Sequence, residues 1–600
     1  MGKRKKFAVV LSIVALAGSL LAGCSNSNSD SSDSAAANAQ NADKPANANT
    51  NKPANADADK PANAAPSDDA GTTPTSDTPT DGGGIVISSF SDIVSINPMY
   101  VQDTASGDAA AFVYANLFDL DRQGNLAAEP WSLAAELPAI SADGLTYTVK
   151  LKPEAKWSDG QPVTADDVKY TFDTMKNPDA GSPGISMVDK VDAVTKIDDH
   201  TVAFKLKQIF APFRYALASA MAPYHVLKDV PVKDLAKNAF GSDPSNTVTN
   251  GPWKWSKWEH GQYLTFDADA NYWGSTKPHI QTITYKIYAD QNTETQALLK
   301  GDVDLTEAVP LTTLDAVKAK SDIDIILKPG PQYEYMQFNF NGANFPDKYS
   351  LFQSQKTRQA IATAINRQGM VDNILKGTGT LMNAPFLPNS WADPKDAAVN
   401  YAYDTEKAKA MLAEDGWKPG KDGILVKDGH RFAFELQYNA GNSRREQVAA
   451  VIQQNLKDVG IEVTPKAIDF ASWIDQNVTP GKYQALLLSW SLSNPDPDGE
   501  SIFSSKYFPP AGQNSGWYKN EKLDALWVKG YSTVDQNERK AIYADVAKEI
   551  STDLPYVFLY QYGLPEAVAK NKVHFAEADR PESSLAYGYF FHMINWWVTP

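Results

Sequence analysis

The sequence of 600 residues contains a single cysteine, Cys24. One thiol cannot form an internal disulfide, and structural zinc sites need several cysteine or histidine ligands. The seven histidines form neither an H-E-x-x-H motif nor a close pair, so a zinc hydrolase has little support. No G-x-S-x-G sequence is present either, and a nucleophile-elbow serine hydrolase is therefore not indicated.

Two further motifs are incomplete. The segment "GWKPGKD" is similar to a phosphate-binding loop, but Asp422 stands where serine or threonine should bind magnesium. The segment "NPDPDGESIFSS" places Asn494, Asp496, Asp498 and Gly499 as in a calcium loop, but Ser505 stands where a bidentate glutamate is required. We therefore expect no cofactor, no bound metal and no enzymatic activity.

The first residues have the order of a secretion signal. Lys3 to Lys6 are basic, and an apolar run follows from Phe7 to Ala22. This run is shorter than the roughly 20 apolar residues of a membrane-spanning helix, and it fits a signal-peptide core. The sequence "LAGC" that ends in Cys24 resembles the lipobox of bacterial lipoproteins, in which the cysteine is diacylated on sulfur with palmitate-type chains. The resemblance implies that 1–23 is a lipoprotein signal peptide and that Cys24 is the lipid attachment site.

Residues 24–84 are expected to form a disordered tether. After Cys24 they are rich in Ser, Asn, Ala, Asp, Pro and Thr and contain no aromatic residue. The pentapeptide "KPANA" recurs at Lys44, Lys52 and Lys60, a period that is too short and too polar to build a packed repeat. Two or three acyl chains on Cys24 would hold such a tether stably at a membrane surface.

The charge of the chain is strongly negative. Its formal net charge is −16 at pH 7, and removal of the basic signal would make it more negative still. An acidic protein of this kind is not suited to binding nucleic acid or to adhering electrostatically to anionic lipid.

The body, residues 85–600, has the mixed pattern of an α/β protein. From Phe432 to Asn494 the pattern predicts strand, helix, strand, short helix and strand, which is a unit with mainly parallel strands. Elsewhere we expect helices capped by Thr164, Asn366 and Asp404.

The last predicted strand, "YQALLLSW", is apolar without interruption, as expected of a strand that is covered on both faces. Ligands of open α/β sheets gather beyond the carboxyl ends of such strands. We therefore expect Trp490 to Asp498 to form a loop that faces a cleft.

Several long segments are similar to one family. The most specific is "LTYTVKLKPEAKWSDGQPVTADDVKYTF", and supporting segments are "GPWKWSKWEHGQYLTFDADANYWG", "TRQAIATAINRQGMVDNIL" and "DQNERKAIYADVAKEISTDLPYVFLY". On these segments the body resembles the family 5 extracellular solute-binding proteins of ABC importers. The segments "LLLSWSLSNPDPDGESIFSS" and "LPYVFLY" are most similar to its Gram-positive oligopeptide-binding members.

The resemblance implies a bilobal, periplasmic-binding-protein-like α/β fold (type II, cluster C) with three domains, of which domain I is discontinuous. Domain I maps to 85–125, 250–330 and 556–600, domain II to 126–249 and domain III to 331–555. It also implies a monomeric receptor on the extracellular face of the cytoplasmic membrane, which binds an extended oligopeptide between closing lobes and delivers it to the permease subunits of an ABC transporter. Backbone pairing with strand edges would give affinity that does not depend on the peptide's sequence.

The resemblance further implies candidate site residues. In the family an aspartate just after the tryptophan of the "SW" strand end holds the peptide's α-amino group, and here that position is Ser493. Either Asp496, which we favour, or Asp498 takes this role, or the peptide is held mainly along its backbone. The remaining candidates are the strand edge Ser489, Trp490, Ser491 and Leu492, and the cleft residues Asn97, Thr104, Tyr335 and Tyr562. For the two tyrosines, core packing is the alternative.

Other readings stay open on the sequence alone. The same fold serves relatives that bind nickel complexes, haem or oligosaccharides, and it could equally serve a receptor for a signalling peptide. A surface hydrolase is a further alternative, although no catalytic set is identifiable.

Overall fold

We analysed a computed structural model, which describes residues 78–388, 390–492, 495–510, 512–581, 584 and 588–599. The chain divides into two units, Met1–Thr73 and Pro74–Pro600, and the described residues belong to the second. The predicted signal peptide, Cys24 and nearly all of the predicted tether lie outside the described residues. Within the described ranges, no helix is long and apolar enough to cross a membrane.

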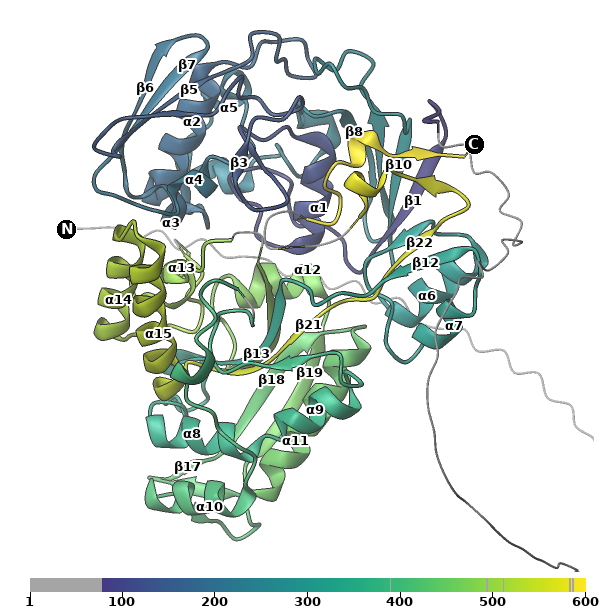
Figure 1. Ribbon diagram of the computed structural model, residues 1–600. Coiled ribbons are helices and arrows are strands. Elements are labelled where there is room, and N and C mark those ends of the chain that lie inside the picture. The colour runs from purple at the N-terminus through teal and green to yellow at the C-terminus, as the bar shows by residue number, and fades with distance from the viewer. Residues whose placement is uncertain are drawn as a thin grey trace, which may run out of the picture. The chain divides into compact units, whose positions relative to one another are not determined.

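A seven-stranded sheet carries the first lobe of this unit (Figure 1). Its strands, in order across the sheet, are β12 (Ile323–Ile326), β22 (Glu566–Ala569), β11 (Leu305–Thr306), β1 (Gly84–Ser89), β10 (Thr282–Ile287), β9 (Tyr263–Ala268) and β8 (Trp253–Glu259). Strand β1 runs parallel to β10 and β11, and the other neighbours in the sheet are antiparallel. The sheet is thus assembled from three separate stretches of sequence, which fits the expected discontinuous domain I.

A four-stranded antiparallel sheet with the order β4 (Ala139–Ile140), β5 (Thr146–Lys150), β7 (Thr201–Leu206) and β6 (Val191–Asp198) completes the first lobe. Helix α2 (Ala165–Lys176) packs on it through Val168 and Phe172, which belong to the same apolar core as Val202 and Phe204. The side chain of Thr164 accepts a hydrogen bond from the backbone of the first turn of α2, and the Asp167 carboxylate accepts one from the Thr164 N–H. The predicted cap is therefore confirmed, as part of a full capping box.

The second lobe is built on a six-stranded sheet. Its order is β14 (Thr380–Leu381), β21 (Tyr556–Tyr562), β13 (Gln332–Phe338), β20 (Ala485–Ser491), β18 (Ala433–Asn439) and β19 (Glu462–Ile468). The predicted strand–helix–strand–helix–strand unit is confirmed as β18, α11 (Ser443–Asp458), β19, α12 (Phe470–Trp473) and β20. Strand β18 is parallel to both β19 and β20, but β13, β21 and β14 pair antiparallel, so the whole sheet is mixed.

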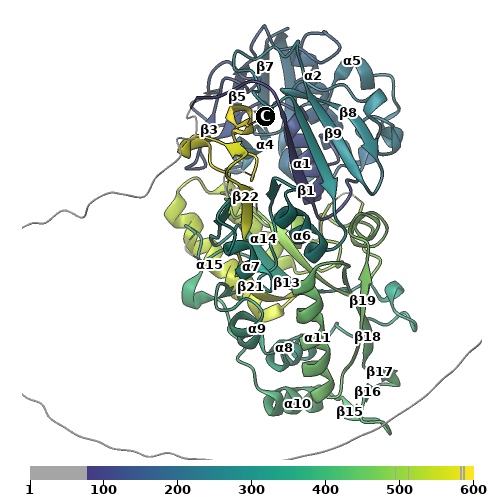
Figure 2. The ribbon, with the colours of Figure 1, turned by 90° about the vertical axis from the view of Figure 1, so that its right-hand side faces the viewer.

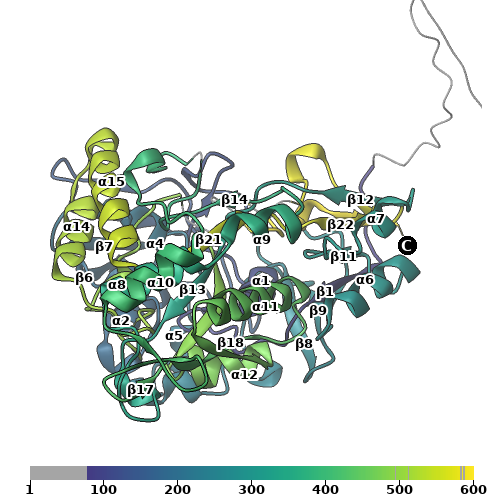
Figure 3. The ribbon, with the colours of Figure 1, turned by 90° about the horizontal axis from the view of Figure 1, so that it is seen from below.

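Helices cover both faces of this sheet, as the apolar sequence of β20 predicts. On one face Leu487 packs in a core with α8 (Gln355–Ala364), α10 (Thr405–Glu414) and α11. On the other face Leu486 and Leu488 pack in a core with α14 (Glu521–Ser532) and α15 (Gln536–Asp553). Figure 3 shows α8, α10 and α11 on one side of β13 and β18. The predicted caps Asn366, on α9 (Arg367–Asn373), and Asp404, on α10, both accept from backbone N–H groups.

The chain passes between the lobes twice, between β12 and β13 and between β21 and β22 (Figure 2). We placed the start of the last domain I segment at 556, but Tyr556–Tyr562 forms β21 and pairs with β13, so the second crossing follows Tyr562. The backbones of the two crossing segments lie against each other. A Cβ added at Gly563 would lie 1.8 Å from the carbonyl oxygen of Lys328, and only glycine fits there.

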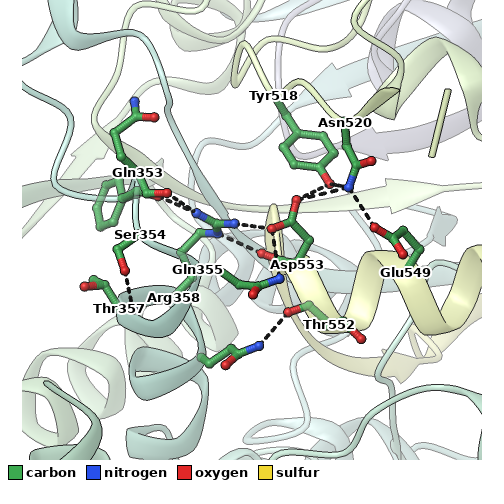
Figure 4. A network of polar contacts seen from close by, with 12 residues as sticks. Gln353, Ser354, Gln355, Thr357, Arg358, Tyr518, Asn520, Glu549, Thr552 and Asp553 are labelled. Carbon is green, nitrogen blue, oxygen red and sulfur yellow. Dashed lines mark hydrogen bonds and ion pairs between the residues drawn. The ribbon is translucent and has the colours of Figure 1, made fainter. Parts of the chain in front are cut away.

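A polar network fixes the entry to β21 (Figure 4). The guanidinium of Arg358 on α8 pairs with the Asp553 carboxylate at the end of α15 and donates to the carbonyls of Phe352 and Gln353. The Tyr518 hydroxyl donates to the same carboxylate at 2.6 Å. This network therefore fixes the backbone at the start of β21, the last strand before the chain returns to the first lobe.

Candidate ligand-binding site

Strand β20 has a free edge in its second half. Its antiparallel ladder with β13 runs over its whole length, from Ala485 to Ser491. Its parallel ladder with β18 contains only the pairs of Ala485 and Leu486. Among the described residues, no strand pairs with Leu487–Ser491 on that side. Unpaired N–H and C=O groups on such an edge can pair with an added extended chain.

Ser489 is the centre of a hydrogen-bond cluster on one face of this strand. Its hydroxyl oxygen accepts from Arg445 Nη2 and from the Tyr562 hydroxyl, each at 2.8 Å, and it donates to Glu334 Oε2 at 2.8 Å. The predicted strand-edge residue Ser489 and the predicted cleft residue Tyr562 are thus brought together. The Arg444 guanidinium lies over the Tyr562 ring, 3.8 Å from its centroid.

Glu334 on β13 compensates the charges of Arg444 and Arg445, which lie in the first turn of α11. It is 0% exposed and pairs with Arg444 and, at 2.7 Å, with Arg445 Nε. Burial alone would raise the pKa of the Glu334 carboxyl, but the charges and hydrogen bonds of the arginines outweigh burial and lower it. The carboxylate therefore stays ionised and holds Ser489 in place.

Tyr335 lies in the core of the second lobe, not in a cleft. It is 1% exposed, and its ring stacks on Tyr556 at 4.3 Å and faces Trp490 at 6.3 Å. Core packing, the alternative we weighed for this residue, is what the structure shows. Trp490 is half-buried, Ser491 is exposed, and the Leu492 N–H extends the ladder by donating to the Pro331 carbonyl at 2.9 Å.

The two aspartates proposed as anchors of the peptide amine differ sharply. Asp496 is bound through both oxygens by Arg539, at 2.8 and 2.7 Å, and its side chain is 1% exposed. Its charge is therefore already compensated within the lobe, which corrects our preference for Asp496. Asp498 is half-buried, and burial first, then Glu500 and Asp496, raise its pKa to about 8. Ser493, the family's anchor position, lies outside the described residues.

The chain on both sides of the predicted cleft residue Asn97 contacts the second lobe. Gln102 Nε2 donates to Thr479 Oγ1 at 2.9 Å, and the Phe90 ring meets Phe470 edge-on at 5.0 Å. Thr104 is exposed as the first residue of α1 (Thr104–Val113). Asn97 is 1% exposed, and its Oδ1 accepts from the Met99 N–H at 3.1 Å. Asn97 thus forms a turn in this structure, and its role in ligand binding stays a prediction.

The lobes also meet through a buried cation, Lys190, that sequence reasoning missed. Lys190 of the first lobe pairs with Glu500 of the second, and its ammonium lies 3.0 Å from the Tyr507 hydroxyl and 4.5 Å from the Tyr531 ring centroid. The Ala211 N–H donates to the Tyr531 carbonyl at 2.8 Å beside it. No sequence motif marks a lysine whose partner lies 310 residues away.

Arg444 and Arg445 were also missed, although a signal was present. Two arginines in the first turn of a helix oppose the positive end of the helix dipole, so they indicate a compensating carboxylate nearby. Their position directly after the β18 strand places them at the carboxyl edge of the sheet, where ligands gather.

Comparison with known proteins agrees with this architecture. The model of the bacterial extracellular solute-binding proteins, family 5 Middle, matches residues 123–507. The oligopeptide-binding protein AppA of Bacillus subtilis is 34% identical over 529 residues, which cover 87% of this chain and 92% of AppA. The glutathione-binding protein GsiB of Pectobacterium atrosepticum is 27% identical, with 82% of this chain and 91% of GsiB covered.

Solved structures give the same result. AppA of Bacillus subtilis in complex with a nonapeptide superposes with a TM-score of 0.80 at 32% identity, over 87% of this chain and 100% of that one. NikZ of Campylobacter jejuni in complex with Ni(L-His) gives 0.73 at 25% identity, over 85% and 99% of the two chains. The fold is that of the type II periplasmic binding proteins, and family members are transport receptors of ABC importers that act outside the cytoplasm, not enzymes. The chain belongs to the bacterial extracellular solute-binding proteins of family 5.

Proposed function

We propose that this protein is an oligopeptide receptor, anchored by lipid at the extracellular face of the cytoplasmic membrane, that delivers peptides to an ABC importer. The observation that carries the proposal is the free edge Leu487–Ser491 of β20, whose last residue lies opposite Gln332, beside the two crossings. The relatives support it, since AppA is named for oligopeptide binding and was solved with a nonapeptide.

The peptide binds in extended form by adding to this edge. Its main-chain N–H and C=O groups pair with those of Leu487–Ser491, so affinity does not require one sequence. Closure of the lobes removes water and strengthens the polar contacts. We assign domain I to the seven-stranded sheet, domain II to the four-stranded sheet and domain III to the six-stranded sheet, with the last boundary moved to follow Tyr562.

Asp498 is the residue that we propose for the peptide's amino group. Without a ligand, the ionised form of the Asp498 carboxyl is disfavoured, because burial and two neighbouring carboxylates raise its pKa to about 8. An arriving ammonium group would reverse this by stabilising the ionised form. Asp496 cannot offer the same gain, since Arg539 already holds both of its oxygens.

Anchoring and delivery complete the proposal. Cys24 would carry the acyl chains after removal of 1–23, and the tether up to residue 84 would let the receptor, as a monomer, reach the permease subunits. The motif "LAGC" and the polar composition of the tether support this part.

Calorimetry with a tetrapeptide in free and N-acetylated form, at pH 6.0 and 7.5, tests the amine contact. Binding of the ammonium should release a proton from Asp498, so affinity for the free peptide should rise with pH by up to about tenfold per unit below pH 8. The acetylated peptide and the Asp498→Asn variant should show no such rise. Equal pH dependence for both peptides would contradict the assignment, and no binding of any peptide would contradict the proposed function.

A further inference from the structure

The backbones of the two lobes meet at Gly441. This residue lies in the second lobe, between β18 and α11, and its φ of +77° is in the left-handed region. A Cβ added to it would lie 1.7 Å from the carbonyl oxygen of Ala289, which lies in the first lobe between β10 and α6 (Gln291–Lys300). No side chain fits at that distance, so only glycine permits this approach of the lobes.

A hydrogen bond between the lobes accompanies this contact. The Gln291 N–H donates to the Gly441 carbonyl at 3.3 Å. Gln291 is the first residue of α6, and the N–H groups of a helix's first turn have no partner within the helix. The second lobe therefore completes the start of a helix in the first lobe, and separation of the lobes would expose this N–H to water.

The same loop of the second lobe positions the arginines of the candidate ligand-binding site. Asn442, the residue after Gly441, caps α11, and its side chain accepts from the Arg445 N–H at 3.0 Å. The Arg445 guanidinium in turn donates to the Ser489 hydroxyl on β20. The contact between the lobes is thus next to the residues that face the free edge of β20.

A second set of contacts joins the lobes on the other side of the molecule. Lys190 pairs with Glu500, at the start of α13 (Glu500–Phe503), and lies over the Tyr531 ring of α14. Figure 1 shows α13 and α14 at the left, whereas α6 lies at the right, near β12 and β22, which lead into the crossings. Because the lobes rotate about the crossings, a small separation at Gly441 becomes a larger one at Lys190.

We propose that Gly441 is the stop that sets how far the lobes close, and therefore how tightly the protein holds its cargo. The consequence for cargo rests on the proposed function, whereas the stop itself concerns only the lobes. Real Cβ atoms essentially never lie closer than 3.0 Å to such a neighbour, so a side chain at position 441 would force the distance to Ala289 up from 1.7 Å to at least that value. Full closure would be lost, and a bound peptide would dissociate faster from a cleft that admits water.

Spin labels on the two lobes measure closure directly. Ala193 on β6 and Ala525 on α14 are both exposed, so Ala193→Cys and Ala525→Cys, in a full-length Cys24→Ser background, provide the labelling sites. We expect double electron–electron resonance to show a distance several ångströms longer in Gly441→Ala than in the parent. Gly441→Asn should show the same shift. Because asparagine adopts left-handed backbone angles more readily than alanine, this second variant adds the side chain with less backbone strain.

Gly377→Ala is the matched control. Gly377 follows α9 in the second lobe and has nearly the same backbone conformation, with a φ of +78°, but none of the described residues lies within 4 Å of a Cβ added to it. Its substitution therefore brings the same backbone strain without a clash against the first lobe. The label distance in Gly377→Ala should equal that of the parent. Unchanged distances in both Gly441 variants, or an equal shift in Gly377→Ala, would overturn the proposal.

Calorimetry and stopped-flow dissociation with Ala-Ala-Ala-Ala test the consequence for cargo. We expect Gly441→Asn to bind this peptide roughly tenfold more weakly or worse, mainly through faster dissociation, and Gly377→Ala to bind it as the parent does. An unchanged affinity in Gly441→Asn at a longer label distance would refute the link between the stop and the cargo. If the parent binds no peptide, the proposed function is wrong, but the label distances still decide whether Gly441 limits closure.

Discussion

The two neighbouring aspartates Asp496 and Asp498 should respond in opposite ways to the same substitution. Asp496→Asn removes the charge that compensates Arg539, a residue 5% exposed whose guanidinium also donates to the Gly530 carbonyl and the Tyr543 hydroxyl. Removing one partner of a buried ion pair costs about 3–5 kcal/mol, because the other charge stays buried. We expect the free energy of unfolding of the second lobe to fall by that amount both at pH 5 and at pH 8.

Asp498→Asn should instead raise the free energy of unfolding above that of the parent, by more as the pH rises. The folded protein keeps the Asp498 proton up to a pKa of about 8, while the unfolded chain releases it near pH 4. The unfolded state therefore binds fewer protons between these values, and this group lowers stability by up to about 1.4 kcal/mol per pH unit. Asparagine cannot ionise, so Asp498→Asn should match the parent near pH 4 and exceed its stability at pH 8.

Urea unfolding followed by tryptophan fluorescence, at pH 5 and 8, measures both effects. The two variants make the same chemical change two residues apart, so each serves as the control for the other. Equal destabilisation by both, or an Asp496→Asn variant as stable as the parent, would refute the reasoning from the Arg539 ion pair.

Two further predictions concern the closed form and the anchor. Lys190→Met should leave the buried Glu500 carboxylate without its cation. We therefore expect a larger radius of gyration by small-angle X-ray scattering without peptide, and weaker peptide binding. Lys207, an exposed lysine of the same lobe, gives the control variant Lys207→Met, and equal radii for both variants would contradict the role of Lys190. Cys24→Ser should abolish incorporation of labelled palmitate and release the protein into the medium, and a variant that stays in the membrane fraction would rule out the lipid anchor.

Much of the second lobe could be predicted from the sequence, because its elements depend on local patterns. The apolar run of β20 indicated a strand covered on both faces, and Asn366 and Asp404 indicated helix starts through the bonds that short polar side chains make to the first turn. The segment Tyr556–Tyr562 was assigned to the wrong lobe, because a strand's sequence does not say which of two sheets it joins.

The site was harder to predict, because its residues act through long-range pairs. Asp496 looked available for the peptide's amino group, yet its partner Arg539 comes from a helix 43 residues further on. Tyr335 looked equally suited to stacking on a ligand or in a core, and only the neighbouring strands that bring Trp490 and Tyr556 to its faces decide between the two. The free edge of β20 arises because its pairing with β18 stops at Leu486, which no single segment reveals.

Native mass spectrometry of the detergent-solubilised protein, purified from cells grown in rich medium, tests the central claim most directly. A receptor that binds main chains along the β20 edge should carry a heterogeneous series of short peptides. A single sugar or metal complex in their place, or cargo that the protein has chemically altered, would contradict the account.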